Sequence, residues 1–117
     1  MALPIIKTAI PKRRYQFGEF SIVILGEIES DDGIPYHFLL GIIPEGASTP
    51  ELFISAEKCP GNQQEEGAYQ MRIIAEKATQ TVNKSNNWEQ LDAFVEDALA
   101  LVSKLLKLTD EKPMLLL

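Results

Sequence analysis

The chain has 117 residues, of which 45% are hydrophobic and 24% are charged, and its formal net charge is −6. This length and composition predict one folded domain and exclude a disordered chain. The acidic balance argues against a nucleic-acid partner, because phosphate contacts need clustered Lys and Arg. No segment approaches the roughly 20 apolar residues of a membrane-spanning helix, so no membrane partner is expected. The single cysteine, Cys59, favours a reducing cytoplasm.

Residues 1–12 are expected to form an irregular lead-in, because Pro4 and Pro11 lack a backbone donor. Residues 13–59 then predict a meander of three strands. The first strand runs from near Arg13 to near Glu29, and a type I′ turn at Asp32-Gly33 leads into the second. This turn would place Leu25 opposite Leu40. Residues 52–57 predict a short edge strand between two prolines.

The two strands of this hairpin are apolar on both faces, which is unusual because a sheet face in water alternates apolar with polar side chains. A second subunit or the chain's own helices must therefore cover each face. We expect a homodimer, face to face or edge to edge, although one helix on each face of a monomer would satisfy the same pattern. The candidate interface residues are Val23, Leu25, Phe38, Leu40 and Ile42.

Residues 62–108 predict two helices. Asn62 and Glu65 have the spacing of a capping box for the first, whose apolar stripe would be Ala68, Met71, Ala75, Ala78 and Val82. A polar segment over residues 83–87 would end it. Asn87 would cap the second helix, whose apolar face repeats with helical period: Trp88, Leu91, Val95, Ala98, Leu99, Val102 and Leu106.

Residues 109–117 form an apolar tail that ends in Met-Leu-Leu-Leu. Four apolar residues in succession would normally fray into water. Two interpretations remain open: the tail packs over the domain's own core or is disordered, or it docks into a groove of a neighbouring subunit or partner.

Together these elements predict an α+β domain of two layers, an antiparallel three-stranded meander followed by two C-terminal helices in the order β-β-β-α-α. The favoured function is that of an acidic cytoplasmic interaction protein, such as a chaperone-like adaptor. Some small acidic α+β dimers are secretion chaperones, but those begin with a helix, so the comparison is an analogy. The alternative is a small-molecule binding module with a pocket between sheet and helices, lined by Tyr36, Tyr69 and Trp88.

An enzyme is the least favoured function. Such an enzyme would have to use His37 or Cys59, the only histidine and the only cysteine. A histidine between two aromatic residues on a strand is more often a packed side chain, and Cys59 before Pro60-Gly61 is more simply part of a turn. One His and one Cys cannot supply the four ligands of a zinc site, and no glycine-rich phosphate loop is present, so neither a metal nor a cofactor is expected.

Overall fold

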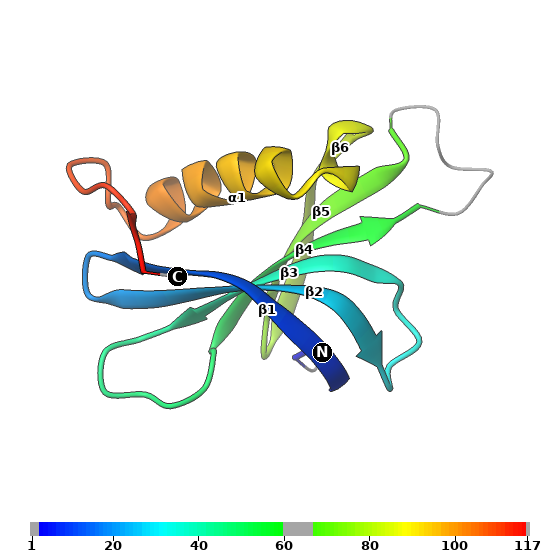
Figure 1. Ribbon diagram of the computed structural model, residues 1–117, viewed down its shortest axis with the longest axis horizontal. Helices are drawn as coiled ribbons and strands as arrows, with labels where there is room; N and C mark the ends of the chain where they lie inside the picture. Colours follow the sequence, from blue (N-terminus) through cyan, green and yellow to red (C-terminus); the bar gives the residue numbers. More distant parts are fainter. Residues whose placement is uncertain (1–2, 60–66, 117) are drawn as a thin grey trace.

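The computed structural model describes residues 3–59 and 67–116 of the chain. These form an antiparallel sheet of seven strands with one helix, α1, lying across one face (Figure 1). The strands follow each other in space as β6-β5-β4-β3-β2-β1-β7. Their bounds are β1 Ile6–Phe17, β2 Phe20–Ser30, β3 Tyr36–Ile43, β4 Leu52–Lys58, β5 Tyr69–Ala75, β6 Ala78–Ser85 and β7 Met114–Leu115; a 3-10 turn (η2) spans Asn87–Glu89 and α1 spans Leu91–Leu105.

The prediction of three strands followed by two helices is therefore wrong. The segment expected to be the first helix contains β5 and β6, which pair through a two-residue turn at Glu76-Lys77. Met71, Ala75 and Val82 fit a helical period by chance, whereas β-branched Thr79 and Thr81 favour a strand. The expected capping box at residues 62–65 lies outside the described residues.

The start of the chain also differs from the expectation. The supposed lead-in is the first half of β1, which continues through Pro11 with irregular register, and the single strand predicted from Arg13 to Glu29 is two strands. The chain reverses at Gly18, whose φ of +59° is the left-handed conformation that glycine adopts readily. A strand tolerates Pro11 where its missing donor is not needed for pairing.

The β2–β3 hairpin exists, but its register is shifted by one residue from the predicted one. Leu25 lies opposite Leu39, and the loop has five residues instead of a two-residue turn. The Asp32 side chain organises this loop, because its carboxylate accepts hydrogen bonds from Ile34 N at 3.1 Å and from Tyr36 Oη at 2.8 Å. A one-residue shift moves side chains to the opposite face. Leu25 and Leu39 therefore share a face.

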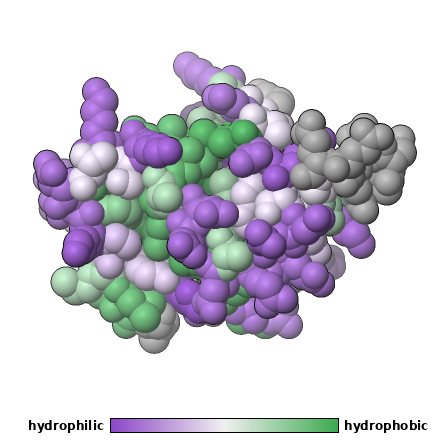
Figure 2. All heavy atoms as spheres, turned by 90° about the horizontal axis from the view of Figure 1, so that it is seen from above, coloured by the Kyte–Doolittle hydropathy of each residue, from purple (hydrophilic) through white to green (hydrophobic). Residues whose placement is uncertain are grey.

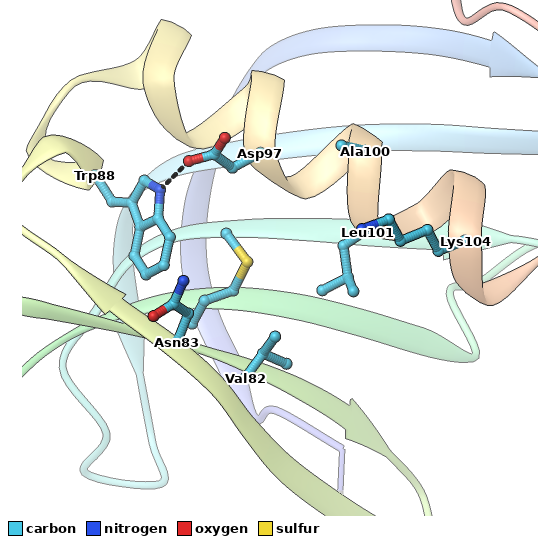
Figure 3. Close-up of a pocket in the computed structure, with 8 residues that line it drawn as sticks. Val82, Asn83, Trp88, Asp97, Ala100, Leu101 and Lys104 are labelled. Atoms are coloured by element: carbon cyan, nitrogen blue, oxygen red, sulfur yellow. Dashed lines mark hydrogen bonds between the residues drawn. The ribbon is translucent and has the colours of Figure 1, made fainter.

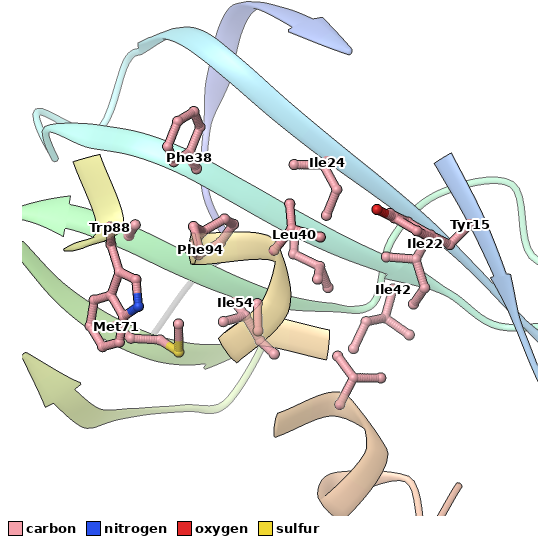
Figure 4. Packing of buried hydrophobic residues seen from close by; sticks show 14 of the residues in the cluster. Tyr15, Ile22, Ile24, Phe38, Leu40, Ile42, Ile54, Met71, Trp88 and Phe94 are labelled. Atoms are coloured by element: carbon pink, nitrogen blue, oxygen red, sulfur yellow. The ribbon is translucent and has the colours of Figure 1, made fainter. Parts of the chain in front are cut away.

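The main hydrophobic core lies between α1 and the sheet (Figure 4). Phe94 and Val102 of α1 are fully buried against strand residues such as Leu40 and Ile54. The helix lies within the range that the apolar periodicity predicts, but Asn87 is not its cap. Gln90 occupies the N-cap position without a side-chain hydrogen bond, and Asn87 begins η2 instead. No helix in the described part of the chain is long and apolar enough to cross a membrane.

The face of the sheet opposite α1 is also buried within one copy. Its cluster consists of Tyr36, Leu39, Phe53 and Ile74, with Leu3, Ile6, Leu25, Ile28 and Ile34 packed around it. Loop residues add to this cover: a Cβ built at Gly41 would lie 2.9 Å from Pro50 Cγ. The apolar character of both hairpin faces is thus accounted for by α1 on one side and by local packing on the other.

Candidate functional site

A hollow of about 290 Å³ lies between the outermost strand β6 and helix α1. Figure 3 shows Val82 and Asn83 rising from β6 toward Leu101 and Lys104 of α1, with Trp88 at one end. We call this site the β6–α1 groove; it is lined by Met71, Val82, Asn83, Trp88, Asp97, Ala100, Leu101 and Lys104.

A bulge in β6 shapes this groove. Met71 pairs with Asn83 and Arg72 with Thr81, so Val82 is an extra residue without a partner on β5. Successive strand residues normally point to opposite faces, but at a bulge the chain is re-aimed. Val82 and Asn83 consequently both line the groove, one offering an apolar and the other an amide side chain.

One end of the groove is fixed by a hydrogen bond from Trp88 Nε1 to Asp97 Oδ2 at 2.8 Å. The indole is buried, with 2% of its surface exposed, so its N–H needs such an acceptor. Lys104, two helical turns beyond Asp97, is exposed at the other end. The groove thus has an apolar middle, a carboxylate at one end and an ammonium at the other.

The groove is bordered by hydrophobic side chains that remain in contact with solvent. Val82 is 41% exposed and Leu105, one helical turn after Leu101, is 40% exposed. Seen from above in the orientation of Figure 1, hydrophobic side chains gather in one band within a mostly polar surface (Figure 2). Grouped exposed apolar side chains of this kind mark interaction surfaces more often than single ones do.

The two edges of the sheet differ in how they are protected. Beside β1 lies β7, and β1 itself contains Pro11, three register shifts and several cations, which are features that discourage further pairing. Strand β6 has β5 on one side, and within the described residues no strand lies on its other side. Its eight residues, Ala78–Ser85, include one charge, Lys84, and no proline. The β6 edge is the less protected of the two.

The predicted interface residues divide between the two faces. Phe38, Leu40 and Ile42 lie in the core beneath α1, with at most 8% of their surface exposed. Val23 and Leu25 lie on the opposite face, where Val23 is 8% exposed and Leu25 packs against the second cluster. The structure does not gather these five residues into one surface patch.

The three aromatic residues predicted for a pocket are also separated. Trp88 lines the β6–α1 groove. Tyr36 lies on the opposite face in the second cluster, where burial, followed by its hydrogen bond to Asp32, raises the pKa of its phenol far above the usual range. Tyr69 packs at the border of the main core and stacks at 5.0 Å on the ring of His37. A pocket shared by all three does not form.

His37 and Cys59, the candidates for catalysis, lie outside the groove lining. His37 Nε2 is 3.0 Å from the carbonyl oxygen of Glu89, and its ring packs between Phe38 and Tyr69. Cys59 is buried, and its backbone N–H donates to Ala68 O at 2.8 Å. The surroundings of His37 are those of a packed structural residue.

A second hollow, of about 460 Å³, lies where the β1–β2 turn meets the loop after β3. Its lining is largely polar turn residues, including Glu19 and Glu45. The β6–α1 groove, by contrast, combines an apolar floor with ordered secondary structure on both sides. Sequence reasoning identified only Trp88 among its residues, because the helix assigned to residues 62–82 concealed β6. The β-branched residues at 79, 81 and 82 were the available signal.

Comparison with protein-family models, with curated protein sequences and with solved structures found no match to this chain. The functional proposal therefore depends on the geometry of the groove.

Proposed function

We propose that this protein binds an extended segment of a partner protein at the β6–α1 groove. The segment adds as a further strand along the outer edge of β6 and places apolar side chains against Val82 and Leu101. Peptide recognition by strand addition uses backbone hydrogen bonds for affinity and pockets for alternate side chains for specificity. The observation that carries the proposal is the position of an apolar hollow directly beside the less protected edge of the sheet.

The partner segment should alternate apolar with polar residues. In an added strand, every second side chain faces the α1 side of the sheet. The groove spans the part of β6 around Val82 and has room for one or two apolar side chains. Asp97 and Lys104 mark its two ends, so a segment with a cationic residue near one end and an anionic residue near the other would match both.

A peptide fits this site better than a small molecule does. Ligand pockets usually measure about 300–1,000 Å³ and enclose most of the ligand. The groove, at about 290 Å³, lies at the lower limit of that range and is open to solvent. A reducing cytoplasm is the compartment that we propose, because a chain with a single cysteine has no use for an oxidising one.

The proposal is tested by selecting binders to the full chain from a phage-displayed library of random peptides. We expect enriched sequences with alternating apolar residues. We also expect the affinity of a selected peptide to fall at least tenfold in Val82→Glu, because a carboxylate would replace an apolar contact. Ile10→Glu is the matched control, since Ile10 is 48% exposed but lies on β1 at the other side of the sheet.

Hydrogen exchange of the complex supplies the second readout. Strand addition should slow exchange of backbone amides in Ala78–Ser85, because free edge N–H groups become hydrogen-bonded. The proposal is wrong if no peptide is enriched, or if Val82→Glu and Ile10→Glu bind the selected peptide equally well. Fluorescence of Trp88, the only tryptophan, reports whether each variant is folded.

A further inference from the structure

The apolar tail forms an extended strand whose side chains remain in water. Met114, Leu115 and Leu116 are 64%, 59% and 56% exposed. Their backbone pairs with Tyr15 and Gln16 of β1, and Leu116 N donates to Arg14 O at 2.8 Å. This position satisfies backbone groups but buries little apolar surface, so releasing the tail costs a few solvent-exposed hydrogen bonds, each worth about 1 kcal/mol.

The tail and the β6–α1 groove are complementary. The tail offers three successive apolar side chains in strand conformation, and the groove offers an apolar hollow beside a strand edge. Asp110 and Glu111, both exposed, precede the tail, while Lys104 is exposed at the groove. Opposite charges near the two surfaces favour their encounter.

The tail is held away from the groove of its own copy. Leu108 packs so closely on Gly18 that a Cβ there would lie 2.9 Å from Leu108 Cδ2. Six residues separate Leu108 from Met114 and span at most about 20 Å when fully extended. Strands β1 and β6 are five spacings apart in the sheet, which is about 24 Å at about 4.8 Å per spacing. With Leu108 in place, the tail reaches the groove of another copy more readily than its own.

We infer that the segment Met114–Leu116 of one copy docks into the β6–α1 groove of a second copy. This inference rests on the proposed function, and it names a second copy of this chain as one partner of the groove. Because the donor and acceptor surfaces differ, the contact is heterologous; reciprocal exchange of two tails closes a dimer, whereas one-way exchange builds a chain of copies. The docked tail also competes with any other segment for the groove.

Light scattering of full-length chains tests the inference over about 1 µM to about 1 mM, where weak contacts are populated. The wild type should associate as its concentration rises. Two variants should stay monomeric throughout: Val82→Glu, which damages the groove, and a tail variant that combines Leu115→Ser with Leu116→Ser. Ile10→Glu should associate like the wild type.

Mixing the two defective variants makes the test specific. The Val82→Glu chain keeps an intact tail, and the tail variant keeps an intact groove, so a mixture should form a one-to-one complex although each alone is monomeric. Monomeric wild type, or a tail variant that associates like the wild type, would overturn the inference.

The peptide selection distinguishes the two proposals. If the tail variant still binds a selected peptide while the wild type shows no tail-dependent association, the groove binds partners but not the tail. If no peptide binds and no association occurs, both proposals are wrong. Tail-dependent association with no binding of selected peptides would restrict the groove to a second copy.

Discussion

An ion pair on the sheet face opposite α1 gives the sharpest test of how this fold is held together. The Glu57 carboxylate accepts hydrogen bonds from Arg72 Nε and Ser55 Oγ, both at 2.6 Å. The side chains of Glu57 and Arg72 are only 5% and 17% exposed. Water therefore screens this pair little. Removing one partner should leave the other charge buried without compensation.

Arg72→Met keeps most of the side-chain volume and removes the guanidinium. We expect the free energy of unfolding to fall by about 3–5 kcal/mol, the usual cost of breaking a buried pair. Glu57→Gln should cost less, about 1–3 kcal/mol, because Arg72 is the more exposed partner and can turn toward water. The double variant should be more stable than the sum of the two losses predicts, since neither charge is then left unpaired.

Urea unfolding followed by Trp88 fluorescence measures each free energy. Trp88 lies beneath α1, so its emission reports loss of the core on the other face and does not depend on direct contact with the pair. A loss below about 1 kcal/mol in Arg72→Met, or strictly additive losses in the double variant, would refute the reasoning. The pair would then behave as a solvent-exposed one.

Two further predictions concern the loops. Partial burial raises the pKa of Asp32, but hydrogen bonds from Ile34, Ile5 and Tyr36 outweigh it and hold that pKa below its ordinary value of 3.8. The carboxylate therefore stabilises the fold above that value and loses this effect at lower pH, so the stability deficit of Asp32→Asn should shrink between about pH 7 and about pH 3, and thermal unfolding of exposed Asp31→Asn should show no such trend. Gly67→Ala should lose more than about 1 kcal/mol of stability, because its Cβ would meet the backbone N of Ser85 at 2.5 Å. Gly33→Ala, with a φ of +74° and no atom within 4 Å, should lose less in the same urea titration, and equal losses would contradict the steric explanation.

The elements that sequence reasoning located correctly are those whose signal is local and strong. The segment containing α1 repeats apolar residues with helical period, and β4 is bracketed by prolines. Strands β5 and β6 were missed because the turn between them, Glu76-Lys77, contains none of the residues that usually mark a hairpin. Their apolar spacing happened to fit a helix as well.

The candidate site was missed for a related reason. The β6–α1 groove depends on a bulge at Val82, and the bulge is a property of how β6 pairs with β5. Once β6 was assigned to a helix, no sequence pattern could place Val82 beside Leu101. The hairpin register failed similarly, because the Asp32 side chain bonds Tyr36 across the loop and lengthens the turn. Such contacts are tertiary, and composition alone does not encode them.

The order of the strands in space also has a consequence for synthesis of the chain. Strands β1 to β6 each pair with the strand that precedes or follows them in sequence, so the sheet can grow as the chain leaves the ribosome. The helix that covers its apolar face is made only afterwards. Until Leu91–Leu105 has emerged, Ile24, Leu40 and Ile54 lack their cover. A nascent chain halted between β6 and α1 should therefore be the species most prone to aggregate, and the one with the greatest need of a chaperone.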